Sequence, residues 1–348
     1  MTEILRHKKE IDDDLARLSR EWHTEWRGRY GGSSEIILES LTSLLNRGGK
    51  RVRGALAMES YYLHGGTRPE VALGAARVIE LVQAYLLVMD DIADNAKMRR
   101  GGPTVHSQLT ASHKEAALKG DAIHYGLSQA TNAAMLASHR AMSELATLPA
   151  PDAARMRATE LLNEDISMTI IGQINDIYNE VARERIKRQE IINTMTWKTA
   201  YYTFVSPLEL GACLAGADGL SGRLREYALR AGVAFQINDD ILGVFGNSFE
   251  VGKSAEDDIR EGKATLLVSH ARKQATESQL RELNLILGKS DATTEECERV
   301  RSIFESTGAK EYAYLLAEKY SHDAETALGA DPEDFLVDLV RFAINRTS

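Results

Sequence analysis

Proline and cysteine are both scarce in this chain, and each scarcity narrows the fold. Six prolines occur in 348 residues, whereas an average usage of about 5% would give about 17. Because proline interrupts helices, its scarcity beside abundant Ala, Leu, Glu and Arg favours a mostly helical protein. The two cysteines, Cys213 and Cys297, form no repeated spacing, which argues against a disulfide scaffold and a zinc site.

Further absences exclude whole classes of function. The nine histidines include no pair spaced for a helical metal site, and the net charge of −9 argues against a nucleic-acid binder. No apolar run approaches the ~18 residues that a membrane helix requires. Residues 1–14 are charged and lack the apolar segment of a signal peptide. We therefore expect a cytoplasmic protein without an integral membrane segment.

Helical periodicity recurs along the chain, and short clusters of turn-forming residues interrupt it. Such breaks occur at 30–33, 65–67, 101–103, 149–152, 216–219, 246–248, 288–291 and 329–332. No alternating strand pattern and no low-complexity linker stands between them. The sequence thus predicts an all-α protein with a single domain over residues 1–348.

Two aspartate pairs, Asp90-Asp91 and Asp239-Asp240, stand out in this helical background. Asp94 follows Asp90 by one helical turn, so their side chains share a face and can converge on one cation. Two such faces opposed across a cavity would hold Mg²⁺ ions and, through them, a diphosphate. Mg²⁺ takes few carboxylates and lets substrate phosphates complete its octahedron. This arrangement suits the ionisation of a diphosphate leaving group.

An aspartate run alone is more often a solvated helix face than a metal site. Here, however, apolar runs at 86–89 and 231–235 precede the two pairs. Carboxylates at the end of an apolar helix face a desolvation cost that a cation or a buried partner must offset. The context therefore favours the metal-site interpretation.

The chain resembles the trans-prenyltransferases, also called isoprenyl diphosphate synthases, on six motifs that occur in the family's order. They are Gly48-Gly49-Lys50-Arg51-Val52-Arg53, Asp90-Asp91-x-x-Asp94 with Arg99-Arg100-Gly101, Gly172-Gln173-x-x-Asp176, Lys198-Thr199, Gln236-x-x-Asp239-Asp240, and Gly252-Lys253 with Asp258-Ile259-Arg260-Glu261-Gly262-Lys263. The resemblance implies the isoprenoid synthase fold, a bundle of ten or more helices around a central cavity, with the aspartate motifs facing each other. It also implies a homodimer.

The implied reaction joins isopentenyl diphosphate head to tail to an allylic diphosphate (dimethylallyl, geranyl or farnesyl) and releases diphosphate. By resemblance, about three Mg²⁺ ions take part. The implied metal ligands are Asp90, Asp94 and Asp239, and the implied catalytic group adds Asp91, Asp240 and Lys198. Gly243 stands where many relatives carry a third aspartate, so we expect the second motif to ligate metal more sparsely than the first.

The resemblance also assigns the two diphosphates to separate basic pockets. The isopentenyl pocket comprises Lys50, Arg53, Gln83 and Arg100, and we expect Lys50 and Arg53 to share one helical face. The allylic pocket comprises Arg99, Lys198, Thr199, Gln236, Lys253 and Lys263. Two interpretations stay open for Gln173 and Asp176: residues lining the site near the carbocation, or a buried polar pair bonded across helices.

Product length depends on how deep the growing chain can reach. Each helical turn before Asp90 lies ~5.4 Å deeper, so Tyr85 and Leu86 are candidates for the cavity floor. With no two-residue insertion in the first motif, this combination resembles the geranylgeranyl (C20) synthases. Farnesyl (C15) and longer (C25+) products stay open. A terpene cyclase is disfavoured because Leu242 and Gly246 replace its second-motif ligands, and a non-catalytic regulatory subunit because both aspartate motifs are present.

Overall fold

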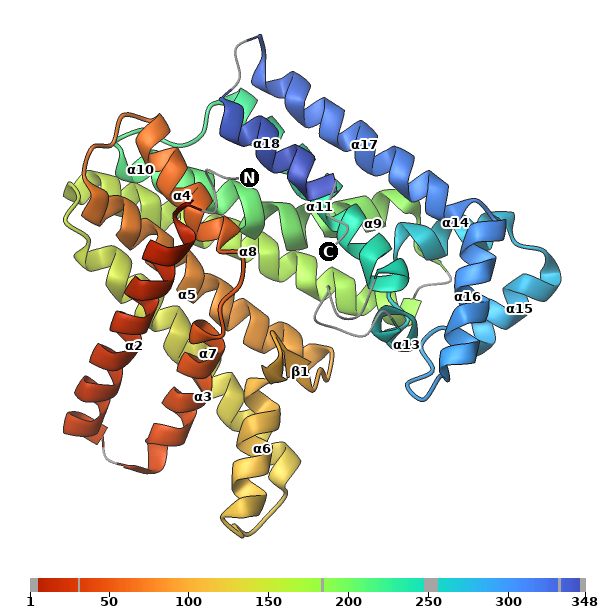
Figure 1. Cartoon of the computed structure of the whole chain (residues 1–348), viewed down its shortest axis with the longest axis horizontal. Helices are drawn as coiled ribbons and strands as arrows, with labels where there is room; N and C mark the ends of the chain where they lie inside the picture. The colour runs from red at the N-terminus through yellow and green to blue at the C-terminus, as the bar shows by residue number, and fades with distance from the viewer. Residues whose placement is uncertain (1–5, 31, 183–184, 247–255, 331–332, 345–348) are drawn as a thin grey trace. The chain divides into compact units, whose positions relative to one another are not determined.

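The computed structural model describes residues 6–30, 32–182, 185–246, 256–330 and 333–344. Over these residues the chain is almost wholly helical, and its only strands, β1 (Met98–Arg99) and β2 (Gly102–Pro103), form a two-stranded antiparallel hairpin. Figure 1 shows helices of very different lengths joined by short turns. The predicted all-α fold with ten or more helices is confirmed.

Two compact units make up the chain. The N-terminal unit contains 2–163 and 206–219, and the C-terminal unit contains 164–205 and 220–348. The long helix α8 (Asp152–Ala182) begins in the first unit and ends in the second. The single domain expected over residues 1–348 stays a prediction.

The N-terminal unit is built around α5 (Pro69–Ala93). Its other elements are α2 (Lys8–Tyr30), η1 (Gly32–Ser34), α3 (Glu35–Asn46), α4 (Val52–Leu63), α6 (Val105–Glu115), α7 (Ala122–Thr147) and α10 (Ser206–Leu214). Helices α2, α3, α4, α6, α7 and α10 all contact α5. A helix covered on all sides is hydrophobic around its whole circumference, and α5 buries residues on every face from Val71 to Val88.

The expectation that no apolar run is long enough for a membrane helix is wrong for α5. By length and composition alone, α5 passes the test for a membrane-spanning helix, with a mean hydropathy of 1.7 over its most apolar window. However, 72% of that window is buried inside the protein. Burial in the core therefore accounts for the apolar composition of this helix.

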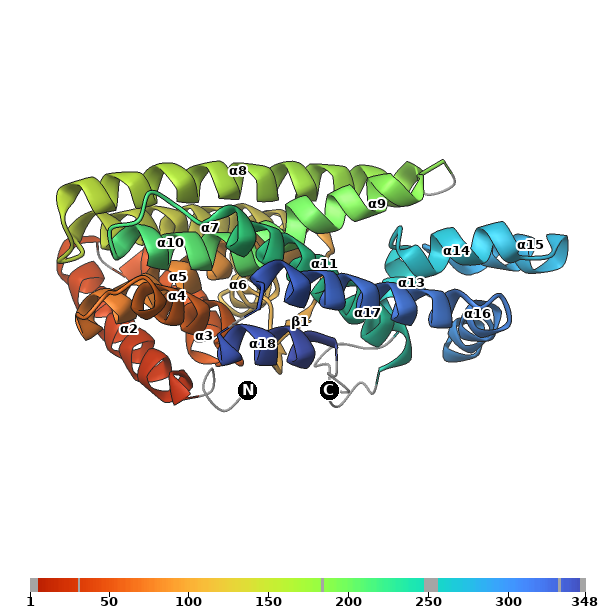
Figure 2. The same ribbon diagram turned by 90° about the horizontal axis from the view of Figure 1, so that it is seen from above.

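The C-terminal unit is organised around α11 (Gly222–Phe245). Its remaining elements are α9 (Arg188–Met195), η2 (Thr196–Val205), α13 (Asp257–Glu261), α14 (Leu266–Gln274), α15 (Glu277–Ile286), α16 (Thr294–Ser306), α17 (Ala309–Leu328) and α18 (Asp334–Ile344). Helices α11 and α17 lie side by side in Figures 1 and 2. A cluster of buried hydrophobic side chains from α9, α11, α13, α14, α15, α16 and α17 forms the core and holds α13 near the end of α11.

Candidate active site

Three carboxylates lie at the C-terminal end of α5. Asp90 and Asp91 occupy its last turn and Asp94 caps it, and the Asp94 amide donates a hydrogen bond to the Asp90 carbonyl at 2.9 Å. As the spacing predicts, Asp94 lies one helical turn after Asp90, at the cap of α5. The C-terminus is the negative end of the helix dipole, and Asp91 is fully buried. Such a cluster requires positive charge close by.

Arg99 supplies part of that charge. Its Nε donates to Asp91 Oδ1 at 2.7 Å and its Nη2 to Asp90 Oδ2 at 3.3 Å. Burial alone would lower the pKa of Arg99, but Asp91, Asp90 and Asp94 together hold it above its ordinary value. Arg99 therefore lies at the first aspartate motif, and its predicted contact with the allylic diphosphate stays a prediction.

Arg100 forms the turn of the hairpin with Gly101, and both have positive φ angles, 53° and 70°. Two-residue hairpin turns of this kind favour Asn and Gly, so an arginine here carries backbone strain, a feature that clusters at functional sites. With its amide oxygen turned toward them, Gln83 accepts from Arg100 Nη2 at 3.3 Å and from Arg53 Nη1 at 2.9 Å. The structure thus brings together three of the four residues predicted for the isopentenyl pocket.

The electrostatics of this cluster favour an anion. Burial, opposed by Glu80 and reinforced by the neighbouring arginines Arg51, Arg53 and Arg99, lowers the pKa of Arg100 to about 10. Positive charges held close together in a partly desolvated place repel one another. A diphosphate would relieve that repulsion and accept several hydrogen bonds.

The prediction that Lys50 and Arg53 share one helical face is wrong. Helix α4 begins only at Val52, and Arg51 precedes it with a φ of 53°. The buried Arg51 side chain donates from Nη1 to Glu80 Oε2 at 2.7 Å, whereas Lys50 is exposed. The left-handed backbone therefore turns Arg51 into the core and places Lys50 in a loop.

Tyr85 and Leu86 lie on α5 and are half-buried, as residues of a cavity floor would be. Burial raises the pKa of the Tyr85 phenol above its ordinary value, so the hydroxyl stays neutral at physiological pH. Their role as the floor stays a prediction.

In the C-terminal unit a chain of hydrogen bonds joins three predicted residues. Thr199 Oγ1 donates to Gln236 Oε1 at 2.6 Å, and Gln236 Nε2 donates to Asp240 Oδ1 at 2.7 Å. Thr199 and Asp240 are buried, and Asp239 is exposed. Burial, together with the carboxylates of Asp258 and Asp239, raises the pKa of Asp240 well above its usual range.

Asp258 belongs to this carboxylate cluster, although sequence reasoning assigned it no role. A Cβ added to Gly243 would lie 2.0 Å from Asp258 Oδ2, so this carboxylate fills the space next to the glycine. Lys263 Nζ lies 3.2 Å from Asp258 Oδ1 and 3.1 Å from Glu261 Oε2. Glycine at 243 therefore admits a third carboxylate from α13, and the segment 258–263 was the available signal.

Lys198 and Thr199 lie in η2, a π-helical segment whose wider turns often occur at functional sites. A Cβ on Gly172 of α8 would lie 2.2 Å from the Lys198 backbone nitrogen, and one on Gly232 of α11 would lie 2.3 Å from the Ala200 Cβ. These two glycines therefore let neighbouring helices approach the π turn closely.

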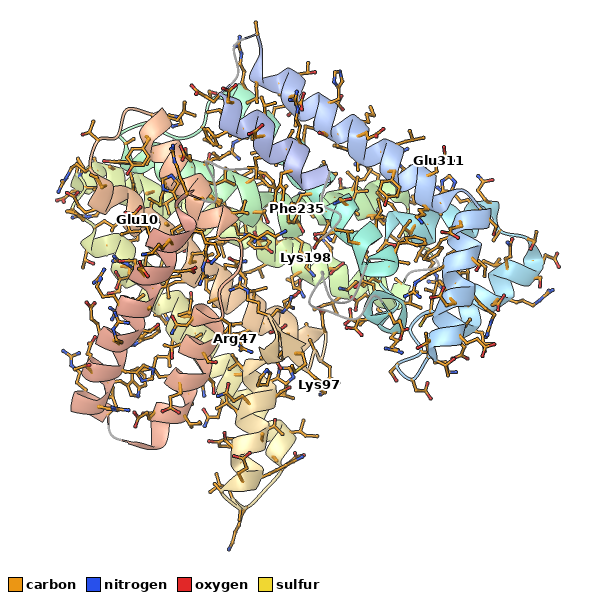
Figure 3. The ribbon with its side chains drawn as sticks, in the orientation of Figure 1. Glu10, Arg47, Lys97, Lys198, Phe235 and Glu311 are labelled. Carbon is orange, nitrogen blue, oxygen red and sulfur yellow. The ribbon has the colours of Figure 1, made fainter. Side chains whose placement is uncertain are left out.

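The Lys198 side chain (labelled in Figure 3) donates from Nζ to Asp176 Oδ2 at 2.6 Å. Asp176 is half-buried and also lines a pocket, so both interpretations of Asp176 stay open. Gln173 is half-buried, and its role stays a prediction.

One pocket of the C-terminal unit gathers most of its predicted residues. The side chains that line it include Asp176, Ile191, Met195, Lys198, Thr199, Gln236, Asp240 and Lys263. Lys253 lies outside the described residues, so the structure does not place it. The pocket combines two lysines with hydrogen-bonding groups and apolar walls, as binding of an anion with an apolar tail requires.

The chemistry of the donor sets fits Mg²⁺. Both clusters present carboxylate oxygens, the ligands that this hard cation prefers. Among the described residues, no group of three or more His, Cys, Asp or Glu side chains is arranged to enclose a metal ion. Mg²⁺ does not need such a cage, because it is usually held by one or two carboxylates together with substrate phosphates and water.

An all-α fold with two carboxylate clusters, each next to basic side chains, defines a class of enzymes that ionise diphosphate esters with the help of a divalent cation. The chain belongs to the polyprenyl synthetase family, whose match covers residues 34–304. It is a trans-prenyltransferase, as the six motifs predicted.

Individual relatives agree with this assignment. The chain is 35% identical over 323 residues to geranylgeranyl diphosphate synthase from Saccharolobus solfataricus, covering 90% of this chain and 91% of that protein. It is 32% identical to geranylfarnesyl diphosphate synthase from Aeropyrum pernix, covering 83% and 86%. A crystal structure of geranylgeranyl pyrophosphate synthase from Corynebacterium glutamicum, complexed with isoprenyl diphosphate and magnesium, is similar with a TM-score of 0.92, 29% identity and 99% coverage of both chains.

Proposed function

We propose that this protein condenses isopentenyl diphosphate with an allylic diphosphate to give geranylgeranyl diphosphate (C20), and that it uses Mg²⁺ and releases diphosphate. The observation that carries the proposal is the pairing of acidic and basic groups in each unit. Asp90 and Asp91 lie beside Arg99, and Asp258 lies beside Lys263. Relatives named as geranylgeranyl diphosphate synthases support the C20 product.

The first chemical task is departure of the allylic diphosphate. Asp90, Asp94 and Asp239 would hold about three Mg²⁺ ions, which when bound stabilise the charge on the leaving group. Arg99, Lys198, Lys253 and Lys263 would contact the same diphosphate. Asp176 restrains the Lys198 ammonium by a hydrogen bond of 2.6 Å, so Lys198 is pre-oriented and less reorganisation accompanies the reaction.

The second task is to hold isopentenyl diphosphate in a separate pocket. Arg53 and Arg100, joined through Gln83, would bind its diphosphate without a metal. Lys50 would approach from the loop before α4. These groups supply positive charge without a bound cation. The pocket would therefore hold isopentenyl diphosphate, the substrate whose diphosphate does not leave.

The third task is to guide the carbocation and remove a proton. Thr199 and Gln236, fixed by their hydrogen bond, would present neutral dipoles near the allylic end. The departed diphosphate would accept the proton that the condensed cation loses. No protein base is required for that step.

A product assay tests the metal and substrate assignments together. With Mg²⁺, isopentenyl diphosphate and each allylic starter, we expect the C20 diphosphate to be the main product by chromatography, and chelation of Mg²⁺ to abolish turnover.

Asp90→Ala and Asp239→Ala should each lower kcat at least about 100-fold, which corresponds to about 2.7 kcal/mol of transition-state stabilisation. Asp13→Ala, at an exposed site on α2, is the matched control and should leave turnover unchanged. Near-normal turnover in either folded aspartate variant would overturn the metal assignment.

Product length provides a second test. If Tyr85 forms the floor, Tyr85→Ala opens space below the growing chain, and further isoprene units enter before release. We expect products longer than C20, detected by chromatography on folded protein. Tyr314→Ala, which alters an exposed tyrosine on α17, should leave the product distribution unchanged. Unchanged products from Tyr85→Ala would rule out Tyr85 as the limit, and a wild-type product of C15 or C25 would replace the C20 proposal.

We also propose that the protein is a homodimer. Ile170, Ile174, Ile177 and Val181 of α8 are spaced along one helical face and are 49%, 61%, 46% and 83% exposed. An exposed apolar stripe of this kind marks an interaction surface, and the three- and four-residue spacing suits pairing with an equivalent helix. We expect a sedimentation mass of twice 38.5 kDa, reduced to one chain by Ile174→Asp but not by Leu285→Asp on α15. A wild-type monomer would contradict the dimer.

For its location we propose the cytoplasm. Both cysteines, Cys213 and Cys297, are buried and unbridged, which suits a reducing compartment. Recovery of the protein from a non-cytoplasmic fraction of its cell would contradict this.

A further inference from the structure

Arg47 connects the end of α3 to the hairpin that carries Arg99 and Arg100 (Arg47 is labelled in Figure 3). It caps α3, where its Nε donates to the Ser43 carbonyl at 3.3 Å. Its Nη1 crosses to the hairpin and donates to the carbonyls of Arg99 at 3.2 Å and Pro103 at 2.8 Å. One guanidinium group therefore holds both strands of the hairpin and ties them to a helix end.

The Arg47 guanidinium occupies the space that a side chain at position 102 of the hairpin would fill. A Cβ on Gly102 would lie 2.1 Å from Arg47 Nη1, 2.9 Å from its Cδ and 3.0 Å from its Cζ. Gly102 is not among the residues with positive φ, so its backbone does not itself require glycine. The absent side chain matters because it leaves room for the Arg47 guanidinium.

A hairpin with two residues in each strand is not stable alone, and this one also carries a strained arginine at its turn. Its two arginines nevertheless reach different partners. Arg99 contacts the aspartates of α5, and Arg100 reaches Gln83. The position of the hairpin therefore sets both contacts at once.

Arg47 also begins the loop that leads to Lys50 and α4. A Cβ on Gly49 in this loop would lie 3.3 Å from Arg100 Cζ, so the loop packs directly against the Arg100 guanidinium. The loop and the hairpin thus meet at Arg100, and Arg47 is attached to both.

We propose that Arg47 is a positioning residue for prenyl transfer, which braces the 98–103 hairpin through the space at Gly102 and so places Arg99 and Arg100 for the two diphosphates. This inference rests on the proposed function. Arg47 acts on the substrates only through the hairpin. Its loss should therefore change KM and kcat, with little change in the thermal midpoint of unfolding.

The test is a double-mutant cycle at the two sides of the contact. Arg47→Ala removes the brace, and Gly102→Ala leaves Arg47 intact but fills its space. Each should raise the isopentenyl KM and lower kcat, with kcat/KM falling about 10-fold or more, since misplaced binding groups are costly. The double variant should be no worse than either single variant, because both remove one shared interaction. Arg47→Lys keeps the charge but lacks the fork, and should restore less than half of the loss.

Arg155 provides a matched control. Its Nη1 also bridges two carbonyls of a turn, Leu148 at 2.8 Å and Ala150 at 2.7 Å, on the connection between α7 and α8. Arg155→Ala should lower the thermal midpoint without changing KM. The inference is overturned if Arg47→Ala behaves in the same way, or if the Arg47 and Gly102 effects add. Wild-type protein that binds both substrates but does not condense them would instead overturn the proposed function, and the cycle would then be measured on isopentenyl diphosphate binding.

Discussion

The organisation of the N-terminal unit depends on three carboxylates placed at the negative end of a buried helix. Asp91 is fully buried in α5, where the helix dipole and desolvation both disfavour its charge. Arg99 offsets this cost through two hydrogen bonds to the pair Asp90 and Asp91. An arginine must therefore lie close to the end of α5, and the short hairpin that follows this helix brings Arg99 back to the two aspartates.

The C-terminal unit meets the same constraint with different means. Asp240 is buried on α11, and Asp258 from α13 approaches it instead of a residue on the same helix. The hydrogen bond from Gln236 and the nearby charge of Lys263 offset part of the cost. Lys198 is held by Asp176 on a π-helical turn that Gly172 and Gly232 allow to pack closely. Both units thus concentrate partly compensated charge, as a site for a metal-bound diphosphate requires.

Much of this arrangement was predictable because it follows helical periodicity. The spacing of Asp90 and Asp94 predicted that they lie one helical turn apart, and the family's motifs grouped Arg53, Gln83 and Arg100, which the structure brings together. Periodicity also predicted the helices themselves. However, it could not show that α5 is covered on every side, because a buried core helix and a membrane helix share the same composition.

Other features arise from backbone conformation and tertiary contact, which helical spacing does not encode. Lys50 and Arg53 do not share a helical face, because Arg51 adopts a left-handed conformation and α4 begins only after it. Asp258 of α13 fills the space next to Gly243 of α11, and in the sequence only the glycine at position 243 indicates that space. The π-helical turn at Lys198, against which Gly172 and Gly232 pack closely, is likewise a feature that helical spacing does not predict.

The central claim is that the carboxylate clusters bind diphosphate through Mg²⁺, and calorimetric titration with inorganic diphosphate tests it most directly. If the claim is correct, diphosphate and Mg²⁺ bind cooperatively, so that each tightens the binding of the other by the same factor. The apparent affinity for diphosphate should then fall sharply when Mg²⁺ is chelated. Equal affinity for diphosphate with and without Mg²⁺ would contradict the account, because the basic side chains alone would then suffice.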